Sequence, residues 1–117
     1  MKPVKKDTNR IAKVNSLIER NLGPILREQL EEFPGLVTVT KVETTKDMKW
    51  AKVWISILGG DDNKILNAIQ GRIYDIQGGI NRHFSSKIIP RLQFVLDTTP
   101  RYVQRIDEVI RKIHEEE

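Results

Sequence analysis

The feature that most constrains the fold is an apolar stripe of helical spacing within the stretch from Asp61 to Asp97. Its members are Ile65, Leu66, Ile69, Ile73, Ile76, Ile80 and Phe84. Steps of three and four residues are typical of one face of an α-helix. Gly71 and the pair Gly78-Gly79 interrupt this helix, and each interior glycine costs about 1 kcal/mol relative to alanine. Three such glycines indicate a kink, so we expect a broken helix that begins at Asp61 or Asp62 and is stopped by Pro90.

A second helical stripe precedes this stretch. We expect its helix to begin at Asp7 or Thr8, to bend at Gly23-Pro24 because proline disfavours helical geometry in the residue before it, and to end at Pro34-Gly35. The apolar positions of the stripe are Ile11, Val14, Ile18, Leu22, Ile25, Leu30 and Phe33.

Three segments read as β-strands. The first is rich in β-branched residues, and a change of parity between Val39 and Val42 predicts a bulge. In the second, buried positions alternate with open ones, and Trp54 and Lys52 fall on the open face, where they are a possible contact surface. The third follows Pro90. The apolar positions of the three strands are Val37, Val39 and Val42, then Ala51, Val53, Ile55 and Ile57, then Leu92, Phe94 and Leu96.

A last helix is predicted after Thr99-Pro100, with an apolar stripe formed by Val103, Ile106, Ile110 and Ile113. We expect a flexible basic arm over residues 1–7, one folded domain over residues 8–114 that includes the last helix, and an acidic tail over residues 115–117. The stripes suffice for one closed core, so a monomer is expected.

The predicted order is helix, strand, strand, broken helix, strand, helix. A three-stranded sheet with helices packed on one face accommodates both periodicities, which makes the fold class α+β. The order matches the K-homology (KH) fold in its prokaryotic, type II arrangement. KH domains clamp a single-stranded nucleic-acid backbone with a Gly-x-x-Gly loop between two helices. This chain contains no Gly-x-x-Gly, so ordinary single-strand clamping is disfavoured.

Composition excludes several classes of function. The 117 residues include no cysteine, so disulfides and thiolate metal sites are excluded. The two histidines, His83 and His114, are far apart and lack partners at ligand spacing, and no catalytic or nucleotide-binding motif occurs. We expect no cofactor and no enzymatic activity. The absence of a secretory signal or an apolar run of about 18 residues makes a cytoplasmic protein the default.

The basic residues point to nucleic acid. Lys and Arg number 20 against 16 Asp and Glu, for a net charge of +4. A positive group free of interleaved acids from Gly78 to Leu96 accompanies the broken helix, where free backbone N–H groups favour phosphate. The candidate RNA contacts are Arg72, Arg82, His83, Lys87 and Arg91, with Lys5, Lys6 and Arg10 of the N-terminal arm as a second group. The alternative is an ordinary solvated surface.

Two blocks of sequence resemble bacterial ribosome-binding factor A. GLVTVTKVETTKDMKWAKVWISILG, Gly35 to Gly59, resembles that family's strand pair, and PRLQFVLDTTPRYVQRIDEVIRKIHEE, Pro90 to Glu116, resembles its last strand and closing helix. The resemblance implies a KH-like assembly factor that binds the small (30S) ribosomal subunit and its rRNA late in maturation, assists rRNA processing and supports growth in the cold. A general single-stranded RNA- or DNA-binding module and a protein-interaction domain are the alternatives.

The resemblance also implies an Ala-x-Gly at the kink, but this chain has no such tripeptide there. A gapless count back from Pro90 places Arg72-Ile73-Tyr74 at that motif, whereas a local shift would place Ile76-Gln77-Gly78 there. The cost of the paired glycines favours a break at Gly78-Gly79, and the gapless register favours Gly71 to Tyr74. Gln77, Gly78 and Gly79 are therefore added to the candidate RNA contacts.

Overall fold

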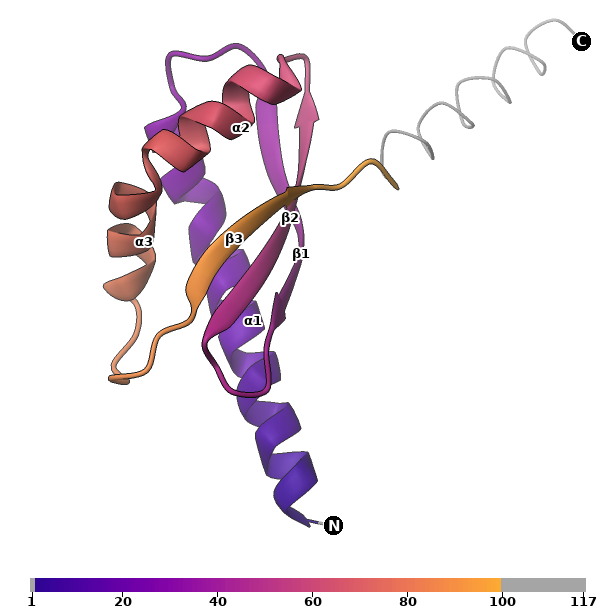
Figure 1. The fold of residues 1–117 in the computed structure, drawn as a ribbon, viewed down its shortest axis with the longest axis vertical. Helices are drawn as coiled ribbons and strands as arrows, with labels where there is room; N and C mark the ends of the chain where they lie inside the picture. Colours follow the sequence, from indigo (N-terminus) through magenta and orange to yellow (C-terminus); the bar gives the residue numbers. More distant parts are fainter. Residues whose placement is uncertain (1, 100–117) are drawn as a thin grey trace, which may run out of the picture.

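The computed structural model describes residues 2–99, and its elements follow the predicted order (Figure 1). The last predicted helix and the acidic tail lie outside the described residues. The elements are α1 (Lys2–Gln29), β1 (Leu36–Thr44), β2 (Trp50–Leu58), α2 (Asp62–Gly71), α3 (Ile73–Asn81) and β3 (Arg91–Leu96).

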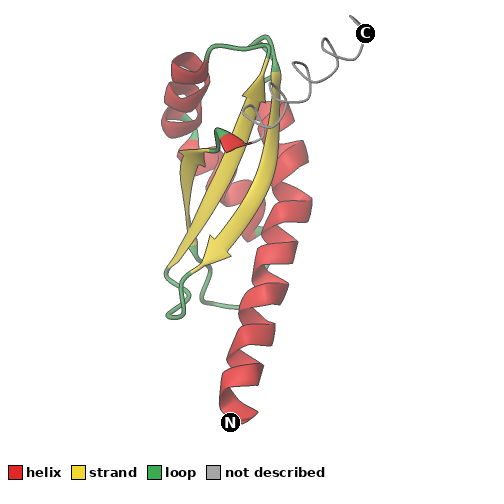
Figure 2. Ribbon diagram, turned by 90° about the vertical axis from the view of Figure 1, so that its right-hand side faces the viewer, coloured by secondary structure: helices red, strands yellow, loops and turns green. Residues whose placement is uncertain are grey.

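The three strands form one sheet in the order β1-β2-β3, with the helices on one face (Figure 2). β2 pairs antiparallel with β1 and parallel with β3. The register of the antiparallel pair shifts between Val39 and Lys41, which confirms the predicted bulge. This arrangement is the α+β, KH-like architecture expected from the sequence.

The core lies between the sheet and the helices, and the alternation predicted for β2 is confirmed. Its inward residues, including Val53 and Ile55, are fully buried. From the helices come a row on α1 and one pair each on α2 and α3: Val14, Ile18, Leu22, Leu26 and Leu30, then Ile65 and Ile69, then Ile76 and Ile80. Apolar residues at helical and strand spacings therefore pack together in one core layer.

Helix α1 begins earlier than expected and runs through Gly23 and Pro24 as one helix. The start predicted at Asp7 or Thr8 is wrong, because the helix already includes Lys2. The prediction placed the start where the apolar stripe begins, but polar residues with adequate helix propensity can extend a helix beyond its stripe. Lys5 and Lys6 therefore lie in a helical segment.

The break in the second helical region lies at Arg72, between α2 and α3. The gapless register was therefore right, and the break favoured at Gly78-Gly79 is wrong, since both glycines lie inside α3. Arg72 leaves helical geometry, with φ −113° and ψ 16°, although its N–H still bonds to Ala68 and Ile69. The sequence offered Asp61 or Asp62 as the start of this helical region. In the structure Asp61 is the N-cap of α2, and its side chain accepts a hydrogen bond from the N–H of Lys64.

Candidate nucleic-acid interface

Four of the predicted basic residues lie around the loop that joins α3 to β3. The helix expected to continue to Pro90 instead ends at Asn81, so Lys87 lies on a loop. Hydrogen bonds from the N–H groups of His83 to Ile80 and of Phe84 to Asn81 tighten the end of α3, and Phe84 packs against the core. The side chains of Arg82, His83, Lys87 and Arg91 are all exposed.

The β1–β2 turn brings further residues to this loop (Figure 1). The N–H of Arg91 donates to the carbonyl oxygen of Lys49 at 2.9 Å, which joins the turn to the start of β3. A groove of about 440 Å³ lies between them and is lined by Met48, Lys49, Trp50, Lys87, Ile88, Ile89 and Arg91. We call this the turn groove. Sequence reasoning missed Lys49 and Trp50, because only the pairing of β2 with β3 places them beside Arg91.

A single carboxylate belongs to the turn itself. Asp47 accepts hydrogen bonds from the Thr45 hydroxyl at 2.5 Å and from the N–H of Lys49 at 3.1 Å. These bonds, the Thr45 bond foremost, lower the pKa of Asp47 below its ordinary value. The turn is further fixed by Met48, which is buried despite a φ of 64°, a region that non-glycine residues seldom occupy. The residues of the groove are thus held by a defined turn.

Gln77 on α3 holds the C-terminal end of the α3–β3 loop, where β3 begins. Its side-chain amide nitrogen donates to Asn81 and to the carbonyl oxygen of Pro90, while its oxygen accepts from the N–H of Leu92. β3 is an edge strand, so these bonds satisfy backbone groups that no neighbouring strand would pair. Gln77 was predicted as an RNA contact, and both of its donors are already used within the chain.

Arg72 is separated from the other predicted basic residues. Its guanidinium donates to the carbonyl oxygen of Gln29, forms an ion pair with Glu32 and lies 5.5 Å from the ring centroid of Phe33. These contacts fasten the helix break to the end of α1. Nine residues of α3, roughly 13 Å of helix, lie between Arg72 and Arg82, so the structure does not bring Arg72 together with the loop.

The two glycines inside α3 differ in their surroundings. A Cβ atom at Gly79 would lie 3.1 Å from Cδ1 of Ile25 on α1, so the absence of a side chain permits close packing of the two helices. A Cβ atom at Gly78 would meet nothing within 4 Å. Of the pair, only Gly78 therefore has open space beside its Cα atom.

A second groove follows the helix break. It has a volume of about 390 Å³ and is lined by Leu66, Gln70, Ile73, Leu92, Gln93 and Phe94. Tyr74, which follows Ile73 in the chain but is not part of this lining, is 88% exposed. Sequence reasoning noted Tyr74 only as part of the motif alignment, although an aromatic residue outside the apolar stripe could have been singled out. Unlike the turn groove, this groove has no charged residue in its lining.

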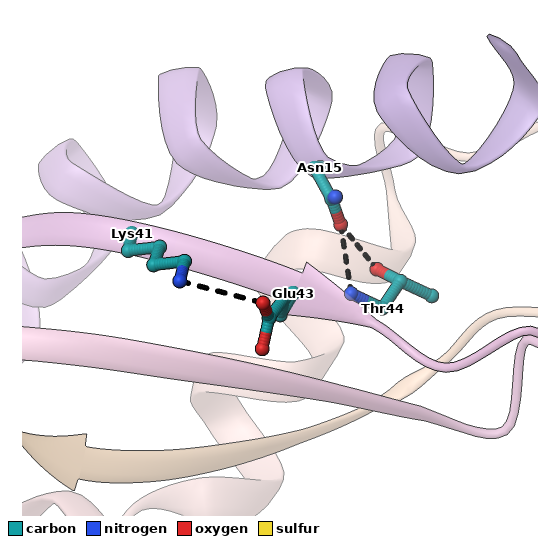
Figure 3. A network of polar contacts seen from close by, with 4 residues as sticks. All are labelled: Asn15, Lys41, Glu43 and Thr44. Atoms are coloured by element: carbon teal, nitrogen blue, oxygen red, sulfur yellow. Dashed lines mark hydrogen bonds and ion pairs between the residues drawn. The ribbon is translucent and has the colours of Figure 1, made fainter. Parts of the chain in front are cut away.

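The open face of the sheet carries Trp54, which is half-buried. The ammonium groups of Lys41 and Lys52 lie 5.0 Å and 4.8 Å from the centroid of one of its rings, so its own strand and β1 supply cation–π contacts. Lys41 also forms an ion pair with Glu43 at 3.3 Å (Figure 3). The predicted contact surface of Lys52 and Trp54 is thus engaged within the sheet.

Polar contacts hold α1 against the C-terminal end of β1. Asn15 accepts hydrogen bonds from the N–H of Thr44 at 3.0 Å and from its hydroxyl at 2.6 Å (Figure 3). The exposed side chain of Arg10 lies on the part of α1 that precedes this contact. The N-terminal part of α1 extends toward the same end of the molecule as the β1–β2 turn (Figure 1).

Within residues 2–99, no cluster of three or more histidine, cysteine or acidic side chains is placed to hold a metal ion. The helices of this part of the chain include none that is long and apolar enough to cross a membrane.

Comparison with known proteins decides the family. The profile of the family described as ribosome-binding factor A matches residues 10–110. The chain belongs to the ribosome-binding factor A family. Ribosome-binding factor A of Bdellovibrio bacteriovorus is 32% identical over 92% of this chain and 82% of its own length. The same-named protein of Opitutus terrae is 29% identical over 91% of this chain and 88% of its own length.

Solved structures of ribosome-binding factor A share the fold. The crystal structure from Thermus thermophilus superposes with a TM-score of 0.64, at 20% identity, over 74% of this chain and 93% of its own. A homology model of the Thermus thermophilus protein, fitted into the cryo-EM map of a 30S–RbfA complex, gives a TM-score of 0.62 at 19% identity, over 71% and 90%. Membership of the ribosome-binding factor A family was expected from the two blocks of sequence, and it is confirmed.

Proposed function

We propose that this protein binds the small (30S) ribosomal subunit through its rRNA and assists late maturation of that subunit and rRNA processing in the cytoplasm. The observation that carries the proposal is the exposed basic group Arg82, His83, Lys87 and Arg91 on a KH-like fold of this family, joined by Lys49. Lysine and arginine side chains neutralise RNA phosphates, which supplies most of the affinity of such interfaces. By family resemblance we also propose a role in cold adaptation. The protein acts as a monomer without a cofactor or catalytic step.

The geometry favours recognition of structured RNA. Arg72 fastens the helix break to the end of α1, and Gln77 fastens α3 to the start of β3, so the backbone that carries the exposed basic side chains is held in place. No Gly-x-x-Gly is available to clamp a flexible strand. A preformed cationic surface suits phosphates that a folded subunit holds at fixed places. Gly78, between the loop and the helix break, leaves open space where a side chain would stand, so RNA could approach α3 closely there.

Sedimentation with purified ribosomal particles tests this function. Wild-type protein should pellet with isolated small subunits and leave large subunits unbound. Assembled ribosomes and a free, unstructured oligonucleotide complete the comparison. Affinity for the free oligonucleotide equal to that for the small subunit would favour a general single-stranded RNA-binding module. Pelleting with neither subunit would refute the proposal.

A charge variant tests the site. Replacing Arg82, Lys87 and Arg91 with alanine should weaken small-subunit binding and lower the slope of log affinity against log salt by roughly 2 to 3, because each phosphate contact contributes about 0.7–0.9. All three side chains are exposed, so the melting temperature should hardly change.

The matched control removes three exposed cations elsewhere, namely Arg20, Arg27 and Lys64. Both triple variants lose the same formal charge, so a general effect of net charge would weaken both alike. Equal affinity and slope for the loop variant and wild type would move the site to another surface, and Lys5, Lys6 and Arg10 would be replaced next.

A further inference from the structure

The turn groove differs from the groove beside the helix break because it combines an exposed aromatic ring with positive charge. Trp50 opens the central strand β2, yet its side chain is 46% exposed, while the next residue, Ala51, is fully buried. Ile88, which also lines the groove, is 55% exposed. The side chains of Trp50 and Ile88 thus expose apolar surface within the same groove, and a flat aromatic ligand would bury that surface.

Charge defines the chemistry of the ligand. Lys49, Lys87 and Arg91 are exposed and belong to the same lining, which contains no acidic residue. Arg91 is the register partner of Trp50 across the β2–β3 pair, so the cation stands next to the aromatic side chain. A ligand that fits must therefore offer an aromatic plane together with negative charge. A nucleotide has both.

The groove is also of suitable size and is held in place. Its volume of about 440 Å³ lies within the ~300–1,000 Å³ typical of small-ligand pockets. One wall is fixed by the N–H of Arg91 bonded to the Lys49 carbonyl and by the buried Met48. The other is fixed where Gln77 bonds to the Pro90 carbonyl. Little reorganisation is needed before a ligand enters.

We propose that the turn groove binds one unpaired nucleotide of RNA, with its base stacked on Trp50 and its phosphates held by Lys49, Lys87 and Arg91. The proposal rests on the proposed function and deepens it, because it states that the recognised rRNA presents a base outside a helix. A paired base is stacked between its neighbours and has no free face, so only an unpaired base can use this ring. An acidic peptide would satisfy the cations but would leave the indole without a stacking partner.

Fluorescence of Trp50 provides a direct test. In Trp54→Phe protein, Trp50 is the sole tryptophan, since the chain has two. A 12-nucleotide unstructured RNA and the small subunit should each quench its emission. Stacking of one base on an aromatic ring contributes roughly 5- to 150-fold to affinity, so Trp50→Leu should lower affinity by that factor. Trp50→Phe, which keeps a ring, should lose less.

Salt and abasic controls separate stacking from charge. Trp50→Leu should leave the salt slope unchanged, whereas the loop charge variant lowers it. An abasic 12-mer of equal charge should bind wild type and Trp50→Leu alike.

Quenching by oligoglutamate equal to that by RNA would overturn the nucleotide assignment in favour of an acidic protein partner. Unaltered Trp50 emission while the protein still pellets with small subunits would overturn this inference alone. Failure of wild type to pellet would instead overturn the proposed function.

Discussion

Gly78 and Gly79 show what a sequence can say about single residues and what it cannot. Their cost to a helix is a local property, and it was the reason to expect a break there. The structure keeps both inside α3, because Gly79 lies against Ile25 of α1, more than fifty residues away in the chain. Which of two adjacent glycines is needed depends on this distant contact, so local propensity could not decide it.

The two glycines make a matched pair of substitutions. Gly78→Ala should stabilise the protein by about 1 kcal/mol, since alanine is the better helix former and a Cβ atom there meets nothing within 4 Å. Gly79→Ala gains the same propensity but crowds Ile25 at 3.1–3.3 Å, so it should be clearly less stable than Gly78→Ala. Chemical denaturation measures both, and equal stability of the two variants would contradict the packing argument. If Gly78 contacts rRNA, the stabilised Gly78→Ala protein should also bind the small subunit more weakly.

Asn15 carries a prediction of the same kind. Thr44 is buried, and Asn15 accepts both its N–H and its hydroxyl hydrogen bonds. Asn15→Ala leaves two donors without this partner, which should cost about 1–3 kcal/mol. Ser16→Ala, at an exposed neighbouring position on α1, serves as the control and should stay within about 0.5 kcal/mol of wild type. Thermal unfolding of the two variants measures the difference in stability between them. Equal stability of Asn15→Ala and Ser16→Ala would show that water satisfies the Thr44 donors as well as the Asn15 side chain does.

At the scale of elements, the strands and the existence of the broken helix could be predicted because each has its own periodicity. The bulge in β1 and the buried face of β2 follow from parity alone. The position of the break needed the family register, since Arg72 is held by Gln29 and Glu32 at the end of another helix. The early end of the helix before Pro90 was missed, because Phe84 continues the apolar stripe although it packs from a turn.

Gln77 joins α3 to β3, and its removal should affect both. Gln77→Ala leaves the Leu92 N–H and the Pro90 carbonyl without their side-chain partner, at a cost of about 1–3 kcal/mol. The loop that carries Lys87 should then become more mobile, and small-subunit affinity should fall. Amide hydrogen exchange of Leu92 reports the first effect, with Gln70→Ala on the exposed side of α2 as the control. Slow exchange at Leu92 in the Gln77→Ala protein would show that the side chain is not what protects this edge.

For the whole molecule, the core was predictable and the site only partly so. The core follows from apolar spacing, which the sequence displays directly. The cations after α3 were found because they form an acid-free run, but Lys49 and Trp50 belong to another run and reach the loop only through the parallel pairing of β2 with β3. The β1–β2 turn and the α3–β3 loop meet only once the sheet has formed, so no local sequence pattern shows that they are neighbours. Local patterns therefore identified only Lys87 and Arg91 among the seven residues that line the turn groove.

Ile55 tests whether the two layers form a single cooperative unit. It lies in the central strand, fully buried among side chains from sheet and helices, and its carbonyl oxygen accepts the N–H of Asp97 beyond β3. Ile55→Ala should lower the free energy of unfolding by roughly 2–5 kcal/mol, because the cavity adjoins both layers and neither can close it alone. Ser56→Ala, one residue along on the opposite face, should change it by no more than about 0.5 kcal/mol. Unfolding followed by far-ultraviolet circular dichroism and by tryptophan fluorescence should give coincident transitions in all three proteins, as expected for one core. An Ile55→Ala protein as stable as Ser56→Ala would show that helices and sheet do not depend on this contact layer.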